Sequence, residues 1–185
     1  MARVFFFLKG LSMRTRLCAV LLVVFMLPGC GRRPAAPAAP AVPHAAAASG
    51  AASVDAGVRA MMGSIAHDVT QGGPAAWLKY FSATPAFFMA SEGSLAFPDI
   101  VSATNTTREL ATRIKHIDLD WGKDLRVDPL TPNLAVVATP WHEVLLYTKG
   151  QRVEEWGYFT AVAEYREGRW QLRDAHWSET PARGK

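Results

Sequence analysis

Cysteine is almost absent from this chain, and neither of its two cysteines lies beyond residue 30. Disulfide bridges therefore cannot hold a folded domain together, and the chain after Cys30 has no thiol for nucleophilic or redox chemistry. The five histidines show no pair at helical i, i+4 spacing and no cysteine partner, so we expect no bound metal. A glycine-rich phosphate loop and a Gly-x-Ser-x-Gly elbow are also missing, and we expect no cofactor.

Positive charge is scarce in the part of the chain that can fold. The sequence has 20 basic and 16 acidic side chains, but four of the basic ones precede residue 30 and no acidic one does. Between residues 52 and 182 there are 12 basic and 16 acidic side chains. This balance provides no basic face for a phosphate backbone, so we expect no binding to nucleic acid.

A short apolar run, Leu17 to Leu27, follows the basic residues Arg14 and Arg16. As a helix the run is only about 16 Å long, well short of the hydrocarbon core of about 30 Å. A signal peptide over residues 1–29 is therefore favoured over a membrane-spanning helix.

The apolar run ends in Leu27-Pro28-Gly29-Cys30, which resembles the bacterial lipobox. The resemblance implies a lipid anchor on Cys30 that binds the protein to a membrane. Gly31 implies, by the same resemblance, a place at the outer membrane facing the periplasm. A soluble leader with a chance cysteine is the alternative.

Residues 30–52 are dominated by alanine and proline. Residues 31–52 contain 11 Ala and 4 Pro, and proline recurs at every third position from Pro34 to Pro43. Such a composition is typical of an extended chain with little to bury. We interpret residues 30–52 as a lipidated cysteine followed by a disordered tether.

Residues 53–180 show the periodicity of a folded domain, and residues 181–185 are expected to be a disordered tail. Apolar spacing predicts a first helix from Ser53, a short second helix with Pro74 in its first turn and a third helix from Asp99 to about residue 117.

After the third helix the apolar period changes to two. Strands are predicted at 118–128, 133–148, 152–166 and 169–178. Short turns between successive strands imply an antiparallel meander. The expected fold class is α+β, with three N-terminal helices packed on this sheet.

The strand predicted at 152–166 is apolar on both faces. One face carries Trp156, Tyr158, Thr160 and Val162, and the other carries Phe159, Ala161, Ala163 and Tyr165. One face has to cover the helices, and the other suits contact with a second copy, so we expect a homodimer. Incidental apolar residues or a bulge are the alternatives.

Late in the chain, Gly157 and Thr160 form a Gly-x-x-Thr motif. The last hairpin reads Gly-x-Trp-x-apolar-x-x-x-His-x-Ser from Gly168 to Ser178. In these features residues 53–180 resemble the SnoaL-like branch of the nuclear-transport-factor-2-like (NTF2-like) superfamily. The resemblance implies a cone, with a curved sheet wrapped round helices and a pocket at the open end. The family that this part of the chain resembles includes isomerases, dehydratases, cyclases and non-catalytic binding domains.

His176 is the first candidate for chemistry. Alternation places Trp170, Asp174 and His176 on one face of the last strand, so we expect His176 to follow the core residues into the pocket. There it can act as a base that Asp174 orients. The alternative is a histidine that packs against aromatic rings.

Glu143 is the second candidate, because alternation places it on the same face as Trp141. If Trp141 lines the cavity, Glu143 does too, and a carboxylate in an apolar cavity has a raised pKa. The alternative is an exposed glutamate beside a half-buried tryptophan.

A cavity lined by aromatic rings suits a flat apolar ligand. The candidate lining residues, each of which can also be ordinary core, are Trp77, Phe88, Trp121, Trp141, Trp156, Tyr158 and His176.

We therefore expect a lipid-anchored envelope protein that binds a small apolar or amphipathic ligand, or a partner protein, without catalysis. The alternative is a cofactor-independent acid–base enzyme (an isomerase, dehydratase or cyclase) that uses His176 with Asp174 or Glu143.

Overall fold

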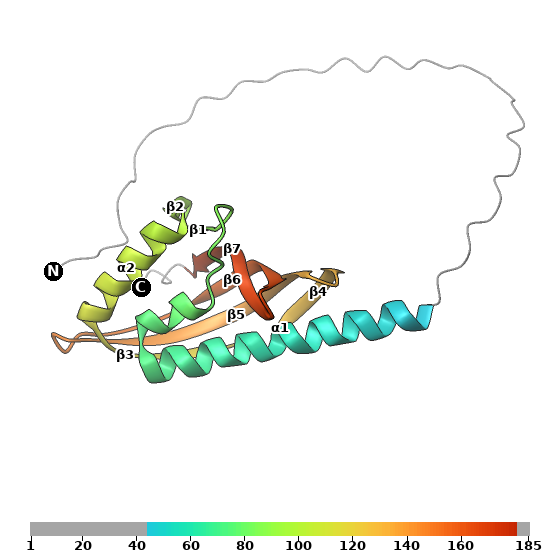
Figure 1. Ribbon diagram of the computed structural model, residues 1–185. Coiled ribbons are helices and arrows are strands. Elements are labelled where there is room, and N and C mark those ends of the chain that lie inside the picture. The colour runs from blue at the N-terminus through green and yellow to red at the C-terminus, as the bar shows by residue number, and fades with distance from the viewer. Residues whose placement is uncertain (1–43, 181–185) are drawn as a thin grey trace, which may run out of the picture. The chain divides into compact units, whose positions relative to one another are not determined.

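The computed structural model describes residues 44–180, which form two α-helices, one 3₁₀ helix and a seven-stranded sheet (Figure 1). Four expected features lie outside the described residues. They are the signal peptide, Cys30, the tether up to residue 43 and the tail at 181–185. Within residues 44–180, no helix is both long enough and apolar enough to cross a membrane.

Helix α1 (His44–Gly72) packs against the sheet through the stripe that the spacing predicts. Its buried side chains are Val54, Val58, Met61, Met62, Ile65 and Val69. The helix begins before Ser53, whose hydroxyl donates to the Gly50 carbonyl within the helix instead of capping it. Residues 44–52, which we expected in the tether, are helical because alanine is the strongest helix former.

The second helix, η1 (Pro74–Lys79), is a 3₁₀ helix that begins at Pro74 as predicted. A hairpin that the sequence did not predict follows, formed by β1 (Phe88–Ser91) and β2 (Ser94–Phe97). Its turn residues Glu92 and Gly93 have φ angles of 49° and 77°, as in the tight turns that match strand twist.

Helix α2 (Ile100–Arg113) is capped by Asp99, whose carboxylate accepts a 2.7 Å hydrogen bond from the Ser102 backbone N–H. The prediction that this helix reaches residue 117 is wrong. Ile114 and Ile117 are buried residues of the next strand. A register shift next to Ile114 lets residues three apart face the same side there, which imitates helical spacing.

The other strands are β3 (Ile114–Trp121), β4 (Arg126–Thr131), β5 (Leu134–Tyr147), β6 (Arg152–Arg166) and β7 (Arg169–Glu179). The predicted strand 118–128 is two strands, both of which pair with the long β5. The sheet order is β2-β1-β7-β6-β5-β3, and β1 runs parallel to β7. The α+β class, with helices preceding a curved antiparallel sheet, is confirmed, with one parallel pair added.

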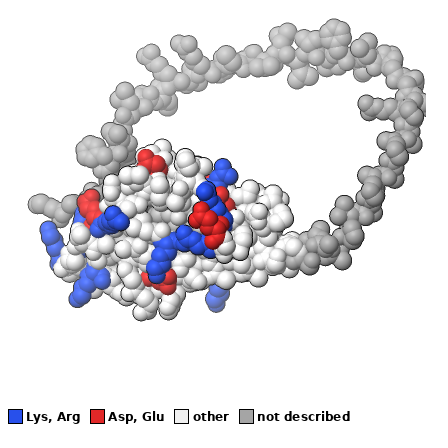
Figure 2. Space-filling view, viewed as in Figure 1, with Lys and Arg blue, Asp and Glu red and all other residues white. Residues whose placement is uncertain are grey.

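The sheet has one covered and one uncovered face. On β6, Phe159, Ala161 and Ala163 are buried on the inner face, which the helices cover (Figure 1). Trp156 and Tyr158 lie on the opposite, outer face and are 49% and 45% exposed. On the side seen in Figure 2, basic and acidic side chains lie beside one another without a continuous basic surface, in agreement with the charge count.

Candidate functional site

Aromatic rings occupy the space between the helices and the inner face of the sheet. Trp177 of β7 lies among four of them, at ring-centroid distances of 4.4 Å from Trp141, 5.3 Å from Phe159, 5.9 Å from Trp77 and 6.0 Å from Trp121. The indole N–H of Trp121 donates to the Met62 carbonyl at 2.8 Å, which fixes the ring against α1. We call these five rings the aromatic cluster, and they stand where the resemblance implies a pocket.

The expectation that His176 points inward is wrong. The pairing of β7 with β6 shifts by one residue after Val162, so β7 carries one extra residue there. Leu172 faces inward before the shift and Trp177 after it, which turns His176 and Asp174 to the outer face. Such a bulge reverses the alternation of a strand, and simple period-two spacing does not reveal it.

Glu143 lies on the inner face of β5, two residues beyond the buried Trp141. Its neighbour His142 points the other way and forms an exposed hydrogen bond with Glu154 at 3.0 Å. Burial raises the pKa of the Glu143 carboxyl, the nearby charges of Glu155 and Glu179 add to the shift, and together they bring it to about 8. Glu143 therefore has the raised pKa expected of a carboxylate beside Trp141.

Two further glutamates, which were not candidates from the sequence, lie on the same inner face as Glu143. Glu155 lies directly opposite Glu143 in the β5–β6 pair, and Glu179 follows Trp177 by two residues on the inner face. Burial raises the pKa of both carboxyl groups. Within residues 50–180, none of these three glutamates forms an ion pair. We call the three residues the glutamate cluster.

The position of Glu155 could have been predicted from the sequence. The turn at Lys149-Gly150 fixes the β5–β6 register and so places Glu155 opposite Glu143. The place of Glu179 depends on the bulge in β7, for which the sequence carries no clear signal.

The raised pKa of Glu143 gives the glutamate cluster one carboxyl group that is able to transfer a proton. In the described part of the chain, no group of three or more His, Cys, Asp or Glu is placed to hold a metal ion. A carboxyl group with a pKa of about 8 keeps its proton at neutral pH and can exchange it with a bound molecule.

The aromatic residues proposed to line one pocket are divided between the two faces of the sheet. Trp77, Trp121 and Trp141 belong to the aromatic cluster inside the fold. The outer face carries the other four, which are Phe88, Trp156, Tyr158 and His176. They do not form a common cavity.

Two hollows on the described surface lie away from the aromatic cluster. The first, of about 380 Å³, lies between α1 and the start of β7 and is lined by Gly57, Met61, Lys79, Tyr80, Arg169 and Trp170, among others. The second, of about 250 Å³, lies on the outer face and is lined mainly by Phe88, Ala90, Thr160, Val162, Asp174 and His176. Both hollows are open to solvent.

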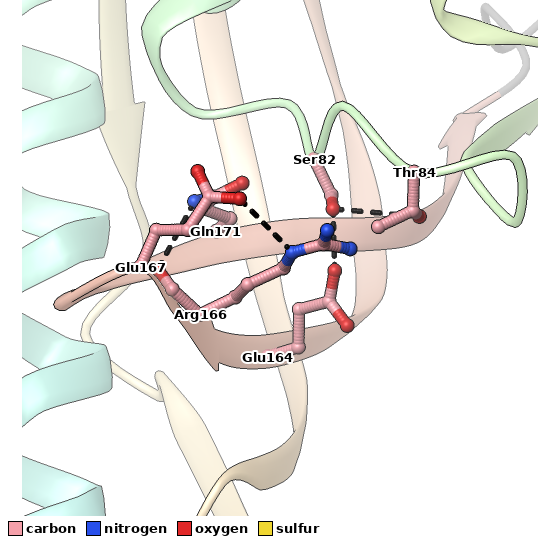
Figure 3. A network of polar contacts seen from close by, with 6 residues as sticks. All are labelled: Ser82, Thr84, Glu164, Arg166, Glu167 and Gln171. Atoms are coloured by element: carbon pink, nitrogen blue, oxygen red, sulfur yellow. Dashed lines mark hydrogen bonds and ion pairs between the residues drawn. The ribbon is translucent and has the colours of Figure 1, made fainter.

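A polar network ties the segment after η1 to the sheet (Figure 3). The fully buried hydroxyl of Ser82 donates to the carboxylate of Glu164 on β6, and the Ser82 backbone N–H donates to the Leu172 carbonyl at 2.8 Å. Gln171 donates to the Arg166 carbonyl at 3.2 Å on the same side. These bonds join the segment after η1 to β6 and β7, and β7 to β6, so we assign the network a structural role.

No protein-family model matches the sequence, and no curated protein matches it. Solved structures do. A putative scytalone dehydratase from Novosphingobium aromaticivorans is 13% identical, with a TM-score of 0.59 over 67% of this chain and 82% of that one. An NTF2-like superfamily protein from Salmonella enterica is 13% identical, with a TM-score of 0.57 over 75% and 96%. A putative calcium/calmodulin dependent protein kinase II association domain from Xanthomonas campestris is 18% identical, with a TM-score of 0.55 over 67% and 86%.

The fold of residues 44–180 is therefore the NTF2-like fold, with helices before a curved, unclosed sheet. Proteins with this fold include both an association domain and a dehydratase by name, so the fold does not select between binding and catalysis.

Proposed function

We propose that this protein is a non-catalytic association domain with the NTF2-like fold, held at the bacterial cell envelope by a lipid on Cys30. It acts by contact with protein rather than by taking a small molecule into the cone.

The aromatic cluster is the observation that carries this proposal. Trp177 lies within 6.0 Å, centroid to centroid, of Trp77, Trp121, Trp141 and Phe159, so the protein's own rings occupy the space that a ligand needs. Closely packed interiors leave few voids, and a ligand has to displace these rings to enter. His176 and Asp174, the residues expected to act on a ligand, lie outside the cone.

Native mass spectrometry of the full chain in detergent tests the association function. We expect protein species without a small molecule bound at one per chain. A small molecule that co-purifies at one per chain would overturn the proposal, because it would show that the cone takes a ligand despite its rings.

Substitution of each of the two cysteines tests the lipid anchor. We expect Cys30→Ala to move the protein from the membrane fraction to the soluble periplasm, because the lipid attaches to that thiol. Cys18→Ala is the matched control and should leave the protein in the outer membrane. Membrane retention of Cys30→Ala would overturn lipidation.

Glu143 supports a second candidate, a cofactor-independent acid–base enzyme. The observation in its favour is a carboxyl group with a pKa of about 8 next to Trp141, without an ion-pair partner in the described residues. Exchange of the α-protons of small ketones in D₂O, followed by NMR, tests it. Exchange by the wild type that Glu143→Gln abolishes and Glu154→Gln preserves would establish this candidate. Equal exchange in all three proteins would exclude it.

A further inference from the structure

The hollow between α1, η1 and the start of β7 shares no residue with the aromatic cluster or the glutamate cluster. We propose that this hollow, which we call the basic hollow, binds an acidic segment of another protein. An apolar side chain of the segment lies against the Trp170 ring, and a neighbouring carboxylate binds Arg169 and Lys79. The inference rests on the proposed association function and names the chemistry of its partner.

The charge of the basic hollow is opposite to that of the domain around it. Its charged lining residues are Lys79 and Arg169, although acidic side chains outnumber basic ones over residues 52–182. Asp68 of α1 binds the Lys79 ammonium at 2.9 Å, so this charge is partly balanced. Arg169 forms no ion pair within residues 50–180. The hollow therefore keeps a positive charge for a partner's carboxylate.

Arg169 is held in place with hydrogen-bond donors left over. One guanidinium N–H donates to the Lys79 carbonyl, and the others have no acceptor among the described residues. The planar guanidinium fork matches the two oxygens of a carboxylate. Because one bond already fixes the side chain, little conformational freedom is lost when a carboxylate binds.

The floor of the basic hollow is apolar because α1 carries small residues there. Gly57 has no side chain, and a Cβ atom at this position would overlap the indole nitrogen of Trp170. Ala60 adds only a methyl group, and the buried Met61 lies beside them. An apolar side chain that enters the hollow leaves water for contact with the Trp170 ring.

Hydrogen bonds lock the three elements around the hollow together. The Leu172 backbone N–H donates to the Tyr80 carbonyl at 2.7 Å, and the Ser82 N–H donates to the Leu172 carbonyl at 2.8 Å, which fixes the end of η1 to β7. The Tyr80 hydroxyl donates to Asp68 at 2.9 Å, which fixes the same residue to α1. The hollow is therefore formed before a partner arrives, which favours binding.

The shape of the basic hollow favours a protein segment over a small molecule. Its volume is about 380 Å³, and it is open to solvent. Sites for small molecules enclose most of the ligand's surface, whereas this hollow covers one side of whatever binds. A protein segment meets this limit, because the neighbouring residues of the partner cover the rest of the side chain.

Selection from a displayed library of random peptides against the full chain in detergent tests the partner's chemistry. We expect the selected peptides to carry Asp or Glu next to an apolar residue, and their binding to weaken as salt is added. Enrichment of basic or purely apolar peptides, or no enrichment, would overturn the inference. The association function would still stand if native mass spectrometry finds no small molecule bound.

A lipid headgroup is the competing anion at a membrane. Binding of the Cys30→Ala chain to phosphatidylglycerol vesicles that Arg169→Gln abolishes, with no acidic peptide selected, would overturn the inference in favour of a lipid.

Arg169→Gln tests the site with a selected acidic peptide as the probe. Arg166→Gln is the matched control, because Arg166 belongs to the same hairpin, pairs with Glu167 and lies outside the hollow. We expect Arg169→Gln to weaken peptide binding by about 10-fold or more, because charge-assisted hydrogen bonds are lost. Arg169→Lys should recover part of the affinity, and Arg166→Gln should bind like the wild type. Equal affinity of Arg169→Gln and the wild type would overturn the inference.

Gly57→Ala tests the floor of the hollow, because its Cβ atom has to displace the Trp170 ring. Gly63→Ala is the control, since it makes the same change on α1 and its Cβ atom meets nothing within 4 Å. We expect only Gly57→Ala to weaken binding of the selected peptide. Unchanged binding in both variants would overturn the inference. If Gly57→Ala misfolds, Ala60→Phe fills the hollow from the exposed surface of α1 and provides the same test.

Discussion

Glu143 and Glu155 face each other across the β5–β6 pair, on the inner face of the sheet beside the aromatic cluster. Like charges directly opposite one another destabilise a sheet. The arrangement is tolerated at neutral pH because the Glu143 carboxyl, with a pKa of about 8, keeps its proton.

Stability should therefore fall as the pH rises. The folded-state pKa of Glu143 lies above its ordinary value of 4.5, so the stabilisation present below pH 4.5 is lost as the pH rises toward about 8. The Glu143→Gln variant should not lose this stabilisation, because glutamine does not titrate. We expect its melting temperature to exceed that of the wild type more at pH 8 than at pH 5, measured by thermal denaturation.

Glu154→Gln is the matched control, with the opposite sign. Hydrogen bonds from Arg152 and then His142 lower the pKa of Glu154, so its carboxylate stabilises the fold above its ordinary pKa and this contribution is lost on acidification. The variant should be less stable than the wild type at pH 7 and equal to it at low pH. The same pH trend for Glu143→Gln and Glu154→Gln would contradict the assignment of Glu143 as the buried group.

Gly157 allows β7 to approach β6 closely. A Cβ atom at this position would overlap the carbonyl oxygen of Ser178, which belongs to the backbone and cannot rotate away. We expect Gly157→Ala to lower the free energy of unfolding by about 1–3 kcal/mol, measured by urea denaturation.

Gly63→Ala is the control for Gly157→Ala. Gly63 is exposed on α1, and a Cβ atom there meets nothing within 4 Å. The substitution should stabilise the protein by about 0.5–1 kcal/mol, because alanine favours the helix. Equal effects of the two substitutions would show that the close approach at Gly157 has no cost.

Trp177→Ala should convert the filled cone into a hollow one. Removal of a fully buried large ring costs about 3–5 kcal/mol. Trp177 is partly buried, so we expect a loss of about 2–3 kcal/mol and an apolar space among the remaining rings. We expect added indole to raise the melting temperature of this variant and not that of the wild type. If indole stabilises the wild type as strongly, the interior already has room for a ligand.

Ser82→Ala should leave the Glu164 carboxylate without its buried donor. The expected loss of stability is about 1–3 kcal/mol, in the range for an unsatisfied buried polar group. Glu164→Gln in the same protein should recover part of it, since a neutral amide is less costly to leave unpaired. Full stability of Ser82→Ala alone would show that the network in Figure 3 contributes little.

The sequence predicted the elements whose signals are local. The apolar stripe of α1 was read correctly because Val54 to Val69 keep strict helical spacing. Helix α2 begins directly after Asp99 because a carboxylate there can cap the first turn. The two faces of β6 followed from alternation without interruption.

The candidate site was harder to predict because a bulge depends on how two strands pair, and it changes which side chains face inward. One extra residue in β7 turned His176 outward and brought Trp177 and Glu179 inward, and nothing in the local sequence marks its position. The end of α2 was placed too late for a related reason, since the register shift beside Ile114 imitates a helical repeat. Glu143, which lies in an uninterrupted part of β5, was placed correctly.

The first buried side chain among those described in α1 is Val54, ten residues after the helix begins at His44. At 1.5 Å per residue, the helical segment from His44 to Val54 is a rod of about 15 Å. A force applied to the N-terminal end of the rod would be carried along its axis into the core. The rod therefore makes the N-terminal end of the described residues stiff, because a helix bends less readily than an extended chain.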